Sequence, residues 1–328
     1  GDDPAADDAA AEAAFVAAER RDPAWGAPAL ERARLAYQQS LRRRGDVAYT
    51  APRVERALAL ADAAVRRDST SAAVGLRGTV RGWQVVSGAA AGDPRAAEAQ
   101  TAAAERDLQV ATRMDPANAD AWASLSGLYA RTRTLADAKL AAATAYDRDP
   151  YLAGADRLLN RLVTSSYDLA QFDDARRYCG ELGRRYPTAV AAAECRLQLM
   201  SVPDAPVPSA DEAWRLAAAV ERAAPAQARD FHARRARLYA AAGLARAGLR
   251  DSARHVVAAA LDGAPQSSAY LALPTIGAWV LYTAGDRDGA FALRRTAIAM
   301  SGRESLDFDM WWWRALKNDP AWRALNDS

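Results

Sequence analysis

The stretch DPANADAWASLSGLYARTRTLADAKLAAATAYDRDP, residues 115–150, carries the strongest fold signal in the chain. It begins and ends with Asp-Pro dipeptides, Asp115-Pro116 and Asp149-Pro150, which stand 34 residues apart. Proline cannot continue a helix and disfavours helical angles in the residue before it, so each dipeptide marks a helix end. Small and large apolar residues recur between the dipeptides at the spacings of two helices. A fixed period near this length predicts a stack of helical hairpins rather than a closed globule.

Similar turn signals divide most of the chain into intervals that can each hold two helices. From Pro116 onward the marking prolines follow one another at spacings of 34, 37, 38 and 40 residues. Further helix ends are expected near Asp22-Pro23, Asp68-Ser69, Tyr186-Pro187, Ala224-Pro225 and Ala264-Pro265. Because almost no strand pattern interrupts these intervals, the expected fold class is all-α.

The 115–150 interval resembles one unit of the tetratricopeptide repeat (TPR) family. The family's alternation of large and small residues is matched by Trp122, Leu125, Ser126, Tyr129, Ala138, Ala142 and Ala145. Ser126 stands where the family usually has glycine, and Ala142 where it usually has an aromatic residue; both still allow close packing. The resemblance implies a right-handed α-solenoid of about seven TPR-like hairpins, which runs through most of the chain.

The same resemblance implies three segments. Residues 1–27 are expected to form a half-repeat, with a single helix over 5–21 and a linker. Residues 303–328 are expected to form a Trp-rich capping helix. Between them, residues 28–302 are expected to form units at about 28–68, 70–116, 119–150, 153–187, 189–225, 227–265 and 269–302. Long loops are expected at 87–95 and at the Pro-rich stretch 201–209.

The charge balance argues against nucleic acid as a partner. The 328 residues carry a net charge of +2, whereas a nucleic-acid surface would show a clustered basic excess. Only Lys139 and Lys317 are lysines among the 43 basic residues, a bias toward arginine that a bacterial genome of high GC content would produce. No run of 18 uninterrupted apolar residues occurs, so no membrane span is expected.

No motif for catalysis or cofactor binding stands out. The two histidines, His232 and His255, lie in expected helices and lack the partners of a zinc-protease or haem-attachment motif. The sequence also lacks a glycine-rich phosphate loop, a Gly-x-Ser-x-Gly elbow and an EF-hand calcium loop. We therefore expect a chain that is not an enzyme and holds no cofactor or metal ion.

Two cysteines flank the expected turn at Pro187, with Cys179 eight residues before it and Cys195 eight residues after it. If antiparallel helices meet there, both cysteines lie roughly 12 Å from the turn, at a rise of ~1.5 Å per residue. A disulfide is then feasible, and two small buried thiols are an equal alternative. A disulfide would favour export, to the periplasm or cell surface, over the cytoplasm. The start at Gly1, without Met, fits a processed exported chain or a trimmed one.

The resemblance also implies where a partner would bind, because in this family the first helices of the hairpins line the concave face. Arginine and aromatic residues are frequent energetic anchors at interfaces. The candidate partner-binding residues at these positions are Arg131, Arg157, Asn160, Tyr167, Arg235, Arg246, Trp279 and Tyr282. The candidate cap or assembly residues are Phe15, Trp25, Trp311, Trp312, Trp313 and Trp322. The family's basic set that clamps a peptide's terminal carboxylate is not reproduced, so that ligand is not expected.

These features favour a non-catalytic scaffold that binds a protein or peptide partner through its concave face or loops. The first alternative is a self-assembling structural subunit of an extracellular filament or homo-oligomer, since a half-repeat leaves one side open for another copy. The second alternative is an accessory or sensor subunit of a larger membrane complex.

Overall fold

The computed structural model describes residues 4–43, 45–88, 94–132, 135–266, 270–301, 310–316 and 319–327. Over these ranges the chain is α-helical with short 3₁₀ helices and has no strand. The helices divide into two compact units, residues 1–155 and 156–328. Most of the expected loop at 87–95 and the first residues of the expected cap, 303–309, lie outside the described ranges.

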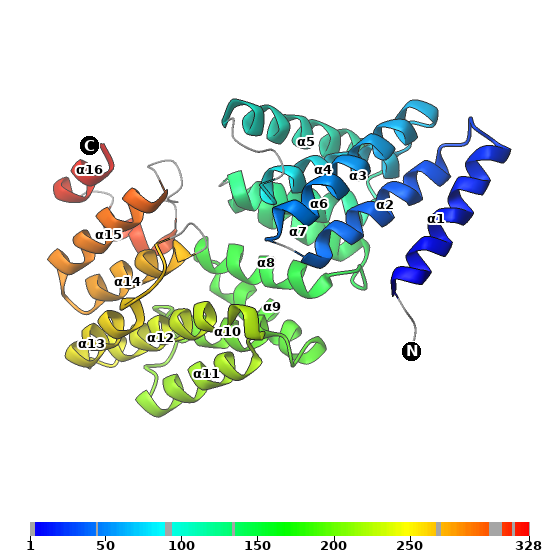
Figure 1. Cartoon of the computed structure of the whole chain (residues 1–328). Coiled ribbons are helices and arrows are strands. Elements are labelled where there is room, and N and C mark those ends of the chain that lie inside the picture. The colour runs from blue at the N-terminus through cyan, green and yellow to red at the C-terminus, as the bar shows by residue number, and fades with distance from the viewer. Residues whose placement is uncertain are drawn as a thin grey trace. The chain divides into compact units, whose positions relative to one another are not determined.

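Unit 1 is a succession of helical hairpins (Figure 1). Within it α2 packs with α3, α4 with α5, and α6 with α7, while α1, the first helix among the described residues, packs on α2. The bounds are α1 (Pro4–Arg21), α2 (Ala27–Ser40), η1 (Leu41–Arg43), α3 (Val47–Arg67), α4 (Ser71–Val86), α5 (Pro94–Met114), α6 (Ala119–Thr132) and α7 (Leu135–Arg148).

Unit 2 continues the same pattern of consecutive helices (Figure 1). Within it α10 packs with α11, α12 with α13, and α14 with α15. The bounds are α8 (Ala155–Asp168), α9 (Phe172–Arg185), α10 (Val190–Leu199), α11 (Ala210–Ala223), η2 (Ala226–Ala228), α12 (Arg229–Arg246), α13 (Arg250–Leu261), α14 (Ala272–Thr283), α15 (Arg287–Ser301), η5 (Trp311–Leu316) and α16 (Pro320–Asp327).

The Asp-Pro dipeptides form the connections between hairpins by a local hydrogen bond. The Oδ1 atom of Asp115 accepts from the backbone N–H of Ala117 at 2.9 Å, and Asp149 accepts in the same way from Tyr151 at 2.9 Å. This side-chain turn satisfies a backbone donor where the proline has ended the helix. The signal that predicted the fold therefore acts through its own carboxylate.

The turns inside three hairpins of unit 2 share one backbone solution. Ala170, Gly248 and Gly285 have left-handed φ angles of 63°, 80° and 81°. The residue that follows each of them donates its backbone N–H to the carbonyl oxygen of the residue five positions before it. For example, Gln171 donates to Ser166 at 2.8 Å. This closure satisfies carbonyl groups that the end of a helix leaves free, and it turns the chain sharply into the next helix.

The helices of unit 1 approach closely because small residues lie between them. Ala57, Ala61 and Ala64 of α3 are buried, and Gly78 of α4 lies against α5. A Cβ atom at Gly78 would stand 2.8 Å from the Cγ of Leu108, which real side chains do not tolerate. Alanine and glycine thus set the distance between neighbouring helices.

The expected all-α succession of helical hairpins is confirmed, including its two ends. The helix expected at 5–21 is α1, and a tryptophan cluster lies near the C-terminus. Trp312, Trp313, Leu316 and Trp322 belong to the same buried core as α14 and α15. No helix among the described residues is long and apolar enough to cross a membrane.

Candidate functional site

The first helices of the hairpins in unit 2 are joined by buried polar side chains. On α8 the hydroxyl of Tyr167 lies 2.7 Å from the Oγ of Ser201, just after α10. The Nε2 atom of Gln198 on α10 donates to the hydroxyl of Tyr239 on α12 at 3.2 Å. Burial raises the pKa of Tyr239, and it raises the pKa of Tyr167 well above its ordinary value, so both hydroxyls stay protonated.

Glu194 is the charged centre of this network. Its carboxylate accepts from Nη1 of Arg235 at 3.0 Å and lies 2.7 Å from Nδ1 of His232. Burial alone would raise the pKa of Glu194, but the charge of Arg235 and the hydrogen bond with His232 outweigh it, so this pKa lies below its ordinary value. Two partners on α12 thus hold a buried carboxylate of α10, and a buried charge needs such partners.

Arg246, at the end of α12, organises the Pro-rich loop that was expected at 201–209. Its Nη2 atom donates to the carbonyl oxygen of Ala205 at 2.7 Å, and its Nη1 atom donates to the carbonyl of Met200 at 2.5 Å. The planar guanidinium has donors enough to bind several carbonyls at once. This side chain therefore holds a loop of its own chain.

The C-terminal residues 310–316, which we call the aromatic segment, lie against three rings of unit 2 that we call the aromatic seat. The seat consists of Tyr167 on α8, Phe172 at the start of α9 and Trp279 on α14. The ring of Trp311 lies edge-on to all three, with centroid distances of 5.8 Å, 5.4 Å and 5.6 Å respectively. Trp312 lies 4.9 Å from Trp279. The segment therefore reaches from α14 to the α8–α9 turn.

Trp313 of the aromatic segment and Trp322 of α16 lie on the side that faces α15, the second helix of the α14–α15 hairpin. Trp313 and Trp322 lie 4.7 Å apart, and Trp322 lies 5.6 Å from Phe291 of α15. The guanidinium of Arg294 stands over both indole rings, at 5.7 Å and 5.1 Å, and burial lowers its pKa to about 10. This side thus buries apolar surface of α15 within the core of unit 2.

The aromatic segment fits its surroundings by shape better than by hydrogen bonding. The indole Nε1 atoms of Trp311, Trp312 and Trp313 are buried, and no acceptor faces them among the described residues. A buried donor without an acceptor costs about 1–3 kcal/mol. Ring contacts and one hydrogen bond, from Arg314 to the carbonyl oxygen of Leu169 at 3.2 Å, thus hold the segment, while its three indole N–H groups carry a polar penalty.

The structure distributes the candidate partner-binding residues unevenly. Tyr167 and Trp279 are buried under the aromatic segment, and Arg235 and Arg246 bind other parts of unit 2. On α8, Arg157 is exposed and Asn160 half-buried; Tyr282 of α14 is half-buried as well. Arg131 lies exposed near the end of α6, in unit 1. A role in partner binding stays a prediction for all of them.

The candidate cap and assembly residues also separate into two groups. Trp311, Trp312, Trp313 and Trp322 meet in one cluster in unit 2. Phe15 of α1 is half-buried in unit 1, and Trp25, in the α1–α2 connection, is 52% exposed. An assembly role stays a prediction for this group.

Cys179 of α9 and Cys195 of α10 form a disulfide, with their Cα atoms 5.8 Å apart. Both residues are buried on either side of the turn at Pro187. The bond closes a short loop between consecutive helices, at a Cα distance that a disulfide prefers. It thereby ties α9 to α10 at the start of the polar network.

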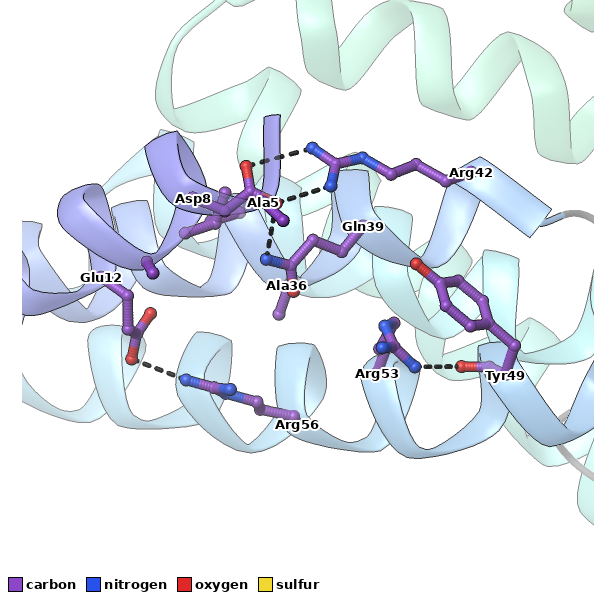
Figure 2. A pocket seen from close by; sticks show the side chains of 11 residues that line it. Ala5, Asp8, Glu12, Ala36, Gln39, Arg42, Tyr49, Arg53 and Arg56 are labelled. Carbon is purple, nitrogen blue, oxygen red and sulfur yellow. Dashed lines mark hydrogen bonds and ion pairs between the residues drawn. The ribbon is translucent and has the colours of Figure 1, made fainter. Parts of the chain in front are cut away.

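A second surface, in unit 1, was not expected from the sequence. A cavity of about 310 Å³ lies between α1, α2 and α3 (Figure 2). Figure 2 shows Arg42 and Gln39 directed at Asp8, and Arg56 directed at Glu12. Arg53 of α3 donates to the backbone carbonyl of Tyr49 at 2.8 Å and stacks on its ring. Three arginines and two carboxylates thus line this cavity together with alanine and leucine side chains.

Comparison with known proteins identifies the fold. No protein-family model matches the chain, and no curated protein matches it. A tetratricopeptide repeat protein from Parabacteroides merdae ATCC 43184 is similar in structure, with a TM-score of 0.54 at 13% identity over 89% of this chain and 98% of that one. Yeast Tom70 aligns with a TM-score of 0.44 at 13% identity, over 84% of this chain and 61% of its own. The likeness to the Parabacteroides protein shows that the chain has the TPR fold.

Proposed function

We propose that this chain is a non-catalytic scaffold that binds a polypeptide partner, and that the aromatic seat of unit 2 receives an aromatic part of that partner. The fold supports the first half of the proposal, because repeat stacks present extended surfaces to other molecules. The contact of Trp311 with Tyr167, Phe172 and Trp279 supports the second half. It is the observation on which the proposal depends.

The chemistry of the seat selects the class of ligand. Edge-to-face ring pairs contribute about 0.5–1.5 kcal/mol each beyond the burial of their area. Three such pairs meet at Trp311, so a segment with a tryptophan at this position gains most. A partner segment whose own tryptophan N–H groups find hydrogen-bond acceptors would avoid the polar penalty that the chain's own segment carries. The favoured ligand is therefore a short polypeptide with adjacent aromatic residues.

The disulfide supports an exported location. Bonds of this kind persist in oxidising compartments and are rare in the cytosol. Because Cys179 and Cys195 are buried, reductants have little access to their bond. We therefore place the scaffold in the periplasm or at the cell surface rather than in the cytoplasm.

The test is the binding of a fluorescent peptide with the sequence of residues 310–316 to a chain whose own segment has been weakened. Trp311→Ala removes three ring contacts from a half-buried position and leaves the fully buried Trp313 in place. The full-length Trp311→Ala chain is expected to bind the peptide saturably, in fluorescence anisotropy. A peptide with alanine at the first two tryptophan positions is expected not to bind.

Two further variants make the result specific. Phe172→Ala, added to the Trp311→Ala chain, removes one wall of the seat and is expected to weaken peptide binding about tenfold, the equivalent of about 1.4 kcal/mol. Trp214→Ala, at an exposed tryptophan of α11, is the matched control and is expected to change nothing. Failure of the peptide to bind a Trp311→Ala chain with native helical content would refute the proposal. Equal effects of Phe172→Ala and Trp214→Ala would refute it as well.

A further inference from the structure

The first helix, α1, docks through charged residues along one stripe. Asp8, Glu12, Phe15 and Glu19 follow one another at intervals of four, three and four residues. With about 100° of rotation per residue, these positions fall within roughly 60° of arc on one face of the helix. No residue of α1 between positions 5 and 21 is fully buried. A stripe that is usually apolar in a docked helix is thus mostly carboxylate here.

A matching set of arginines lies opposite this stripe. Arg32 of α2 bonds Glu12 at 2.7 Å and also binds Glu19. The remaining ion pairs join Arg42 to Asp8 at 2.6 Å, Arg56 to Glu12 at 2.6 Å and Arg67 to Glu19. Each carboxylate of the stripe therefore has at least one arginine of α2, η1 or α3 as a partner. We call these four residues, Arg32, Arg42, Arg56 and Arg67, the arginine groove.

The pKa values agree with this geometry. Hydrogen bonding from Arg42 holds the pKa of Asp8 below its ordinary value. Burial alone would raise the pKa of Glu19, but hydrogen bonds from Arg67 and Arg32 outweigh it and leave this pKa lowered too. The carboxylates of Asp8 and Glu19 are therefore charged at neutral pH and complementary to the groove.

Docking through ion pairs of this kind is sensitive to salt. The arginines are all partly exposed, from 19% of the side chain of Arg32 to 50% of that of Arg56. Exposed ion pairs contribute little individually and are screened by salt, since the screening length falls from ~10 Å at 0.1 M to ~3 Å at 1 M. Release of α1 would uncover a row of arginines that repel one another.

We propose that the arginine groove is a binding site for the α1 helix of a second copy of this chain. The second copy is the occupant that the structure itself specifies, because its α1 carries the same carboxylates at the spacing that the groove matches. Residues 22–26 connect α1 to α2, and an opened connection would let α1 leave its own groove for a neighbour's. Exchange of an identical element costs few contacts and leads to dimers or open chains.

The helix of the same chain competes for the groove. A tethered helix acts at an effective concentration in the millimolar range, so the wild-type chain at micromolar concentration keeps its own α1. Two complementary variants of the full-length chain remove this competition. In the first, the receiver, Asp8→Asn, Glu12→Gln and Glu19→Gln neutralise α1 and leave the groove intact. In the second, the donor, Arg32→Gln, Arg42→Gln, Arg56→Gln and Arg67→Gln neutralise the whole groove and leave α1 intact.

The test is sedimentation velocity on the two variants, alone and mixed at equal concentration. Each variant alone is expected to be a monomer with native helical content, while the mixture forms a heterodimer at about 0.05 M salt. At about 1 M salt the heterodimer is expected to weaken at least tenfold because the charges are screened. A donor that also carries the three neutral α1 substitutions is the matched control and is expected to form no heterodimer.

Three results would overturn the proposal. The first is a mixture that stays monomeric at low salt although both variants keep their helices. The second is a heterodimer of equal strength at low and high salt. The third is a heterodimer that also forms with the control donor. The result is independent of the aromatic seat, since none of these substitutions lies in unit 2.

Discussion

Neutralising Glu194 by Glu194→Gln should strongly destabilise helices α10 and α12 of unit 2. Glu194 is only 7% exposed, and its two oxygens bind Arg235 and His232. Glutamine keeps the shape of the side chain but removes its charge, so the partly buried guanidinium of Arg235 loses its ion-pair partner. Breaking a buried pair in this way costs about 3–5 kcal/mol.

The assay is hydrogen exchange, followed by mass spectrometry, of peptides from α10 and α12. Exchange through local opening reports the free energy of that opening. A loss of about 3–5 kcal/mol in the free energy of opening, at about 1.4 kcal/mol for each factor of ten, should speed exchange of these helices by roughly a hundredfold to several thousandfold. Peptides of unit 1 should exchange at the wild-type rate.

The control is Asp204→Asn, which removes the charge from the Asp204–Arg176 pair. This pair is as close, at 2.5 Å, but the side chain of Asp204 is 54% exposed. An exposed pair contributes about 0–1 kcal/mol, so exchange near Asp204 should rise no more than about fivefold. Equal effects of Glu194→Gln and Asp204→Asn would refute the argument that burial makes the Glu194 network important.

Three further predictions concern other parts of the fold. Gly78→Ala should destabilise unit 1 by about 1–3 kcal/mol, because the new Cβ would stand 2.8 Å from the Cγ of Leu108. Gly82→Ala should instead stabilise unit 1 by about 0.5–1 kcal/mol, because a Cβ there would meet nothing within 4 Å. Urea unfolding measures the change in the free energy of unfolding for each variant. Changes of the same sign in the two variants would contradict the close approach of α4 and α5. Reduction of the Cys179–Cys195 bond should cost about 3 kcal/mol for a loop near 15 residues, and a double Cys→Ser variant whose urea midpoint matched the oxidised chain would disprove this. Because Asp8 and Glu19 of α1 have lowered pKa values, their ion pairs are complete at neutral pH and should be lost progressively as the pH falls from about 4 through these lowered values. An unchanged distance between spin labels on α1 and α3 between pH 7 and about pH 2 would contradict this.

The features that sequence reasoning predicted well are local ones. The Asp-Pro signal works within three residues, through hydrogen bonds such as that from Ala117 to Asp115. The turn around Ala170 needed more than composition, since an alanine takes the left-handed angle that usually indicates glycine.

The contacts that build the candidate sites are distant in sequence, which explains why they were missed. Glu194 and His232 are unremarkable in their own helices and meet across 38 residues. Tryptophan composition predicted a cap, but not that Arg314 would bond the carbonyl of Leu169, 145 residues away. These pairings depend on how successive hairpins are packed, and no period in the sequence encodes that packing.

The stripe on α1 is visible in the sequence as charge periodicity. Its residues stand at positions 8, 12, 15 and 19, a regular helical pattern, yet three of the four are acidic. A search for apolar periodicity passes over such a stripe, although charge periodicity matched to arginines in the next two helices indicates the same docking. Phe15, the apolar member, was identified as an assembly candidate without its charged neighbours.

The central claim, that the aromatic seat receives polypeptide segments and is filled by the chain's own, is tested most directly by one comparison of affinities. The peptide of residues 310–316 is titrated into wild-type chain and into Trp311→Ala chain under identical conditions. Because the wild-type segment competes from within the chain, the wild type should bind the peptide at least tenfold more weakly than Trp311→Ala. Equal affinity, or binding to neither chain, would contradict the claim.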